Sequence, residues 1–69
     1  MKAPHERIKM RMRRLRRAKG WTQMDLAKKS GLTQAFISQL EAGRQKNPGI
    51  ASLLRIAKAL GVSLEELLQ

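Results

Sequence analysis

Two glutamines, an alanine and a serine between residues 34 and 39 have the spacing of one helix face, and their side chains could read a nucleic acid. A glutamine amide places a donor and an acceptor side by side, which matches N6 and N7 of adenine in the major groove. Solvated helix faces usually carry charges, whereas Gln34, Ala35, Ser38 and Gln39 are short or uncharged. Ala35 would fit against a thymine methyl, and Ser38 could bond a base edge or a phosphate. The alternative is that both glutamines are ordinary surface residues.

Polar and basic residues on both sides of this segment could hold a phosphate backbone. Thr22 and Gln23 stand at the beginning of a helical pattern, where unpaired N–H groups and the positive end of the helix dipole bind phosphate. Gln23 could also brace Gln34 through an amide–amide hydrogen bond. The loop after residue 42 could make a second backbone contact, unless it is an ordinary polar turn. Its candidate residues are Arg44, Lys46 and Asn47.

These groups belong to two short helical patterns that meet at Gly31. Ala27 is a small residue four positions before the glycine, and Thr33, Ile37 and Leu40 follow it on one side of the second pattern at 100° per residue. Two helices of this kind pack closely and leave the polar face of the second helix free. The spacing predicts a helix-turn-helix at about residues 22–42, with residues 33–42 as the helix that enters the major groove.

Three helix starts share one signal. An apolar residue precedes a Thr or Ser cap and packs against the fourth helical residue as a hydrophobic staple. The caps Thr22, Thr33 and Ser63 place these starts at about residues 22, 33 and 63. The staple pairs are Trp21 with Leu26, Leu32 with Ile37, and Val62 with Leu67.

Two further helices complete the prediction. A stripe of Ile8, Met12 and Leu15 ends before Gly20, and Met10 falls off that stripe, so we expect it to be exposed. Another helix covers about residues 50–60 after Gly49, a weaker cap than Ser or Thr. Phe36 is expected at the core edge. The predicted fold is all-α, a five-helix bundle that forms one domain over residues 1–69.

Composition excludes several classes of function. The 69 residues include no cysteine and one histidine, His5, without a partner at metal-ligand spacing. We therefore expect no disulfide, no metal and no other cofactor. The acids are dispersed without a paired-carboxylate geometry, so an enzyme is not expected. No apolar run approaches the roughly 18 residues of a membrane span, and no secretory signal is present, so we expect a cytoplasmic protein.

The positive charge is concentrated at the start of the chain. The formal net charge is +10, and residues 1–20 hold nine of the 15 Lys and Arg but one of the five acids. Like charges this dense repel one another along a helix, which favours a polyanion as the partner. A solubilising face is the simpler explanation. A basic module that binds proteins or membrane surfaces is another, although the apolar stripe of this helix is narrow.

Two structural contacts are predicted from side-chain position. Arg16 follows Leu15 at a core edge and Glu41 follows Leu40 in the same way, so the two could form a partly buried ion pair. The last helix is very short and crowded with leucines that cannot all be buried inside one monomer. We expect them to contribute to a dimer contact; they are Leu64, Leu67 and Leu68.

Nearly the whole chain, from about Ile8 to Leu68, resembles the XRE family of helix-turn-helix domains, which includes the lambdoid phage repressors and Cro. The similar segments are Leu15-Arg16, residues 20–23, Leu26-Ala27, residues 31–34, residues 37–44 and spaced positions from Pro48 to Ser63. The resemblance implies a five-helix bundle with Gln23 and Gln34 at the DNA surface. It also implies the base-facing set Thr33, Gln34, Ala35, Ser38 and Gln39, and it supports the Arg16–Glu41 pair. Gly49, Ala35 and Phe36 depart from the usual pattern, so the target sequence does not transfer.

The predicted function is a small transcriptional regulator, a repressor that binds a palindromic DNA operator as a homodimer. Its two reading helices would then lie about 34 Å apart, one turn of B-DNA. No small-molecule effector is expected. An antitoxin that also binds a toxin, or a restriction–modification controller of the same fold, are alternatives that the sequence does not separate.

Overall fold

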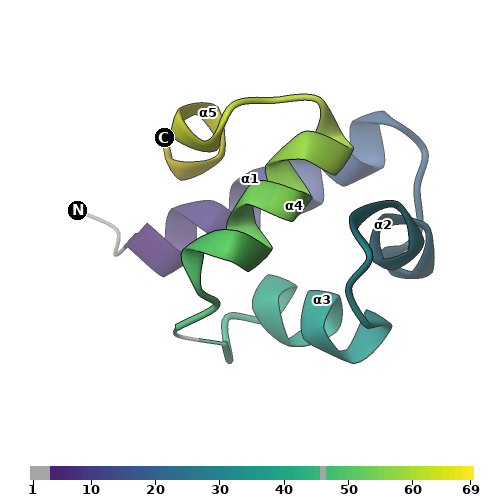
Figure 1. Ribbon diagram of the computed structural model, residues 1–69, viewed down its shortest axis with the longest axis horizontal. Helices are drawn as coiled ribbons and strands as arrows, with labels where there is room; N and C mark the ends of the chain where they lie inside the picture. Colours follow the sequence, from purple (N-terminus) through teal and green to yellow (C-terminus); the bar gives the residue numbers. More distant parts are fainter. Residues whose placement is uncertain (1–3, 46) are drawn as a thin grey trace.

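Five α-helices form in the computed structural model, which describes residues 4–45 and 47–69, without the side chains of residues 4–6 (Figure 1). No strand occurs in these two ranges. The helices are α1 (Pro4–Ala18), α2 (Gln23–Ser30), α3 (Gln34–Glu41), α4 (Ile50–Leu60) and α5 (Leu64–Leu68). The all-α, five-helix prediction is therefore confirmed. None of the described helices is long and apolar enough to cross a membrane.

The predicted caps set three of the helix starts. Thr22 Oγ1 accepts from the Asp25 N–H at 3.1 Å, and the Thr22 N–H donates to Asp25 Oδ2 at 2.8 Å, which together form a capping box. Ser63 and Glu66 form the same box at the start of α5. Thr33 Oγ1 accepts from the Phe36 N–H at 3.1 Å. Gly49 caps α4 without a side-chain hydrogen bond, as its lack of a side chain requires.

The core lies where all five helices meet. Residues from each helix are buried there, and the large hydrophobic side chains that are fully buried are Met12, Leu26, Ile37, Leu40, Ile56 and Leu67. α1 packs against α3 and α5, α2 packs against α3 and α4, and α4 also packs against α5. In Figure 1, α3 therefore lies along one edge of the molecule and α5 along the opposite edge. Met10 is exposed and Phe36 is partly buried against the core, as predicted.

Gly31 makes the turn between α2 and α3. Its φ is 74°, in the left-handed region that residues with a side chain rarely adopt. The Gly31 and Leu32 N–H groups both donate to the Ala27 carbonyl, which satisfies the end of α2. Ala27 itself is buried, so the two helices approach closely at this point. The predicted meeting point of the two helices is confirmed.

The leucines of α5 require a correction. Leu67 is fully buried in the chain's own core, where the staple pairing with Val62 would place it. Its side chain is therefore not available to a second copy, and the prediction that it contributes to a dimer contact is wrong. Leu64 and Leu68 are partly buried and keep some exposed surface.

Candidate nucleic-acid interface

The exposed face of α3 carries the residues predicted to read bases. Ile37 and Leu40 are buried on the opposite side of the helix, which fixes the direction of this face. All of its side chains are exposed and none is charged; they are Gln34, Ala35, Ser38, Gln39 and the cap residue Ala42. Thr33 is also exposed, as the base-facing set requires, although a spacing of 100° per residue put it on the same side as Ile37 and Leu40. The helical spacing does not apply to Thr33, because it is the extended N-cap with a φ of −81° and a ψ of 155°.

A buried ion pair holds α3 against α1. Arg16 Nε donates to Glu41 Oε2 at 2.7 Å and Arg16 Nη2 donates to Glu41 Oε1 at 2.8 Å, so the pair is bidentate. Glu41 is fully buried and Arg16 is only 8% exposed. Arg16 Nη1 also donates to the Trp21 carbonyl at 2.7 Å, at the start of α2. The predicted Arg16–Glu41 pair is present. Through it, Arg16 contacts the end of α3 and the residue that precedes the cap of α2.

Glu41 has two further partners that the sequence did not predict. Gln23 Nε2 donates to Glu41 Oε1 at 3.2 Å, so the amide expected to brace Gln34 holds Glu41 instead. Arg13 Nη2 donates to the Glu41 backbone carbonyl at 3.2 Å, and Arg13 Nε lies 3.8 Å from Glu41 Oε1. Arg13 lies one turn before Arg16 on the same side of α1, and this spacing could have predicted that it also reaches Glu41. One carboxylate thus joins α1, α2 and α3.

The surroundings of Glu41 shift two pKa values. Burial alone would raise the pKa of Glu41, but hydrogen bonds from Arg16 and Gln23 and the charges of Arg16 and Arg13 outweigh it and lower the pKa. The hydrogen bond to Glu41 raises the pKa of Arg16 above its ordinary value, against the opposing effect of burial. Both groups are therefore charged at neutral pH, as a bidentate pair requires.

The start of α2 offers fewer phosphate donors than the sequence suggested. Asp25 accepts the Thr22 N–H, and that backbone hydrogen bond is the main reason why the pKa of Asp25 is lowered. A phosphate would therefore meet the Thr22 hydroxyl and the first N–H groups of α2 rather than the Thr22 N–H. The Gln23 side chain is half-buried and directed at Glu41.

The loop after α3 presents the other predicted phosphate contacts. Arg44 and Asn47 are exposed, and the Arg44 N–H donates to the Gln39 carbonyl at 2.9 Å, which ties the loop to the end of α3. Lys46 lies outside the described residues. Along the chain, the base-facing residues of α3 thus come after the start of α2 and before this loop.

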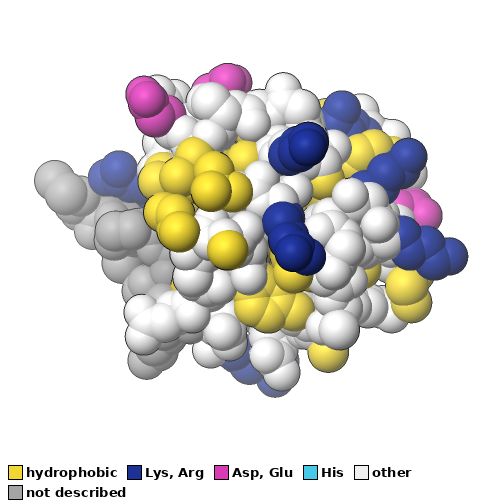
Figure 2. All heavy atoms as spheres, viewed as in Figure 1, with side chains coloured by type: hydrophobic (Ala, Val, Ile, Leu, Met, Phe, Trp, Pro, Cys, Tyr) yellow, Lys and Arg dark blue, Asp and Glu magenta, His cyan; other side chains and the backbone are white. Residues whose placement is uncertain are grey.

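Exposed hydrophobic residues gather on another face of the molecule. Ile50 is 62% exposed and Leu54 is 50% exposed, one turn apart on α4. Leu64 and Leu68 of α5 are partly exposed, and α5 packs against α4. Figure 2 shows hydrophobic side chains gathered over α5 and the beginning of α4. We call Ile50, Leu54, Leu64 and Leu68 the α4–α5 patch; the sequence interpretation missed its α4 half.

Comparison with known proteins decides the family. A sequence model described as helix-turn-helix matches residues 12–67. The chain belongs to the XRE family of helix-turn-helix proteins. It is 50% identical over 54 residues to the uncharacterized HTH-type transcriptional regulator y4dJ of Sinorhizobium fredii, which covers 78% of this chain and 69% of y4dJ. It is 34% identical over 61 residues to the regulator SinR of Bacillus subtilis, which covers 88% of this chain and 55% of SinR.

Solved structures of family members superimpose closely. A hypothetical transcription factor NHTF from Neisseria has a TM-score of 0.92 at 33% identity, over 97% of this chain and 76% of that one. The restriction–modification controller C.AhdI from Aeromonas hydrophila has a TM-score of 0.83 at 36% identity, over 88% and 91%. SinR in complex with DNA has a TM-score of 0.85 at 34% identity, over 90% and 98%. By name, these proteins are two HTH-type transcriptional regulators, one of them uncharacterized, a hypothetical transcription factor and a restriction–modification controller.

Proposed function

We propose that the chain is a sequence-specific regulator of transcription that binds duplex DNA with α3 in the major groove. The observation that carries the proposal is the exposed, uncharged face of Gln34, Ala35, Ser38 and Gln39, held in place by the buried Glu41 at the end of the same helix. Family membership supports it, and so does the similarity to SinR, which was solved with DNA. A fixed helix can present hydrogen-bonding groups to base edges at a defined angle.

Each group on this face has a chemical role in the proposal. The Gln34 and Gln39 amides bond base edges, the Ala35 methyl packs against a thymine methyl, and the Thr33 and Ser38 hydroxyls bond a base or a phosphate. The phosphate backbone is held on two sides of α3. The start of α2 supplies Thr22 and Gln23, and the loop supplies Arg44, Lys46 and Asn47.

We further propose that the regulator acts as a homodimer on a palindromic site, as a repressor. The α4–α5 patch supports the dimer because it includes Ile50 and Leu54, the two most exposed of the large hydrophobic residues in the described part of the chain. A two-fold contact through this patch would pair each residue with its counterpart. The proposed contact therefore keeps Leu64 and Leu68 from the sequence prediction and adds Ile50 and Leu54. It no longer includes Leu67, which is buried.

Selection of bound sites from a random duplex pool at stated salt tests the DNA-binding proposal. We expect an enriched sequence with two-fold symmetry and half-sites about one helical turn apart. Enrichment of a single half-site would keep sequence-specific binding and remove the homodimer. A pool without any enriched sequence would contradict specific recognition.

Sedimentation of the Leu54→Glu variant tests the proposed dimer separately. A charge in the middle of an apolar contact should shift the protein toward the monomer, whereas the fold should persist because Leu54 is half-exposed. Met24→Glu is the matched control, since Met24 is 43% exposed on α2 and does not belong to the patch. If wild type dimerises and both variants dimerise equally well, the patch is not the interface.

A restriction–modification controller is the second candidate, because the matched region covers 91% of C.AhdI. The two candidates share the DNA chemistry and differ in the genes controlled. Mapping bound sites on the source genome separates them: a site upstream of a paired methyltransferase and endonuclease favours the controller. An antitoxin would instead form a stable complex with a toxin protein.

A further inference from the structure

The outer surface of α1 is basic on two sides, and the two sides face different neighbours. Lys9, Arg13 and Arg17 recur every four residues; we call them the α3-side row. Arg7, Arg11 and Arg14 form a second set, the α5-side row. Met10 lies between the rows, because a shallow hollow on each side includes it. The DNA contacts proposed above, made by the helix-turn-helix and the α3–α4 loop, use none of these six cations.

Two contacts place the α3-side row next to the end of α3. Arg13 donates to the Glu41 carbonyl at 3.2 Å. A Cβ added to Gly43 would lie 3.3 Å from Lys9 Cδ and 3.6 Å from Lys9 Nζ, so the lysine side chain runs beside the turn that follows α3. Gly43 immediately precedes Arg44, a proposed phosphate contact. The row therefore continues the basic surface of the loop onto α1.

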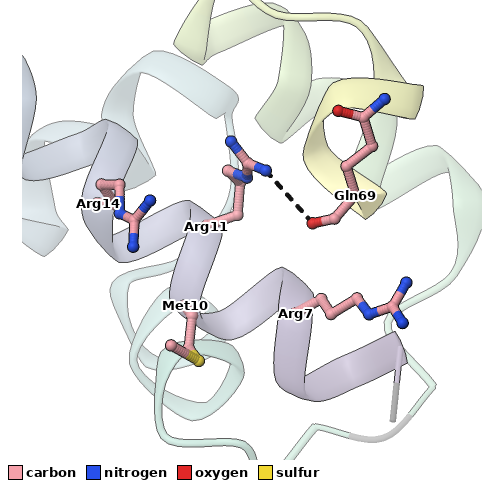
Figure 3. Close-up of a pocket in the computed structure, with 5 residues that line it drawn as sticks. All are labelled: Arg7, Met10, Arg11, Arg14 and Gln69. Carbon is pink, nitrogen blue, oxygen red and sulfur yellow. Dashed lines mark hydrogen bonds between the residues drawn. The ribbon is translucent and has the colours of Figure 1, made fainter. Parts of the chain in front are cut away.

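The α5-side row lies against the other end of the molecule. Arg11 Nη2 donates to the carbonyl of Gln69, the residue that follows α5, at 3.5 Å. Arg7, Arg11 and Arg14 line a hollow of about 170 Å³ together with Met10 and Gln69 (Figure 3). The hollow of the α3-side row is larger, about 360 Å³, and Lys9, Arg13 and Arg17 line it with Met10 and Arg14.

We propose that Lys9, Arg13 and Arg17 bind backbone phosphates of the same duplex that α3 reads, beside the carboxyl end of α3 and beyond the loop contacts. The inference rests on the proposed DNA-binding function and extends its interface to a third element. Charge complementarity and continuity with Arg44 favour the phosphodiester backbone as the occupant. Arg14 borders both hollows, whereas Arg7 and Arg11 lie on the α5 side alone and do not take part.

The geometry of the row suits several phosphates. At 1.5 Å rise per residue, Lys9 to Arg17 spans about 12 Å along α1, enough for more than one phosphate of a strand. Arg13 keeps 44% of its side chain exposed. A guanidinium has five N–H donors, so Arg13 can hold the Glu41 carbonyl and still donate to a phosphate. The contact would also connect phosphate binding to the position of α3 through Glu41.

Two matched double variants test the row without disturbing Glu41. Lys9→Gln/Arg17→Gln removes two charges from the α3-side row, and Arg7→Gln/Arg11→Gln removes two from the α5 side, where neither residue borders the α3-side hollow. Binding of a 30-base-pair duplex of random sequence is followed by fluorescence anisotropy between 50 and 200 mM salt. Since each phosphate contact contributes about 0.9 to the slope of log K against log salt, the first variant should flatten the slope by about two and the second by less than one.

The outcomes separate this inference from the proposed function. Equal changes of the salt slope in the two double variants would contradict phosphate binding by the α3-side row, because net charge alone would then explain the loss. Duplex binding by wild type would still leave the proposed function intact. Absence of duplex binding by wild type would overturn both. Arg13→Gln should lower affinity further, and Arg13→Lys should restore most of it, with thermal unfolding measured on each variant to exclude loss of fold.

Discussion

The exposed faces of α3 and α1 differ in charge, although Glu41 of α3 and Arg16 of α1 join the two helices. The face of α3 has no charged side chain, and the outer surface of α1 has six cations and Met10. An uncharged amide can distinguish one base edge from another but contributes little attraction at a distance. Cations attract any duplex and carry no sequence information. Under the proposed function, selectivity would therefore lie on α3, and attraction on α1 and the α3–α4 loop.

Glu41 is the point where the two faces depend on each other, and its loss should have the largest effect. Glu41→Ala leaves Arg16 buried without its carboxylate, which typically costs about 3–5 kcal/mol. We expect much lower thermal and urea stability, together with weaker binding to every duplex. Glu65→Ala is the control, because Glu65 is exposed on α5, and its change should stay within about 0.5 kcal/mol. Similar losses in both variants would show that Glu41 does not hold the faces together.

Acid should weaken the same junction. The folded pKa of Glu41 is lowered, so the unfolded chain binds a proton at this site more readily than the folded chain does. The stabilisation is therefore fully present above the unfolded value of about 4.3 and is lost as pH falls through the lower folded pKa. A carboxyl NMR titration should place the Glu41 midpoint below about 4.3, with urea stability falling over the same pH range. A midpoint above that value would contradict the ion-pair geometry.

Gln34→Ala should affect selectivity with little effect on general attraction. Removing a bidentate amide from a base edge typically costs about 1–3 kcal/mol on the matched site. Gln34 is exposed, so the fold should be unaffected. Binding to a selected site and to random DNA is compared by anisotropy at one salt concentration. If both affinities fell by the same factor, Gln34 would belong with the phosphate contacts.

Arg44→Gln should weaken general attraction to DNA without changing selectivity, and its effect on affinity should be the smallest of these variants. The loss of one phosphate contact flattens the salt dependence by about one unit and weakens all sequences alike. The measurement is the slope of log K against log salt for both a selected and a random duplex. A loss confined to the selected duplex would move Arg44 into the base-reading group. Lys46→Ala is expected to behave as Arg44→Gln does.

Local signals predicted most of the fold. Thr22, Thr33 and Ser63 began helices because each accepts a backbone N–H three residues on, an interaction set within four residues of chain. Gly31 ends α2 because it adopts a positive φ. The Arg16–Glu41 pair was also predictable, since both residues border the core on helices that pack together.

The choice among nearby partners was not predictable from spacing. Gln23 had two possible partners, and only the packing of α2 on α3 places its amide at Glu41 instead of Gln34. In α5, five residues are too few for helical periodicity to show which leucine faces inward, although the staple with Val62 pointed to Leu67. Exposure of Ile50 and Leu54 depends on how α5 covers α4, which is a tertiary property.

The side chains of Gln34, Ala35, Ser38 and Gln39 point outward and make no side-chain hydrogen bond within the described part of the chain. Folding therefore makes few demands on the identity of these four residues. Retargeting to another DNA site, by natural drift or by design, could proceed one substitution at a time without first repairing the scaffold. The tolerance ends at the next position, because Leu40 and Glu41 are buried.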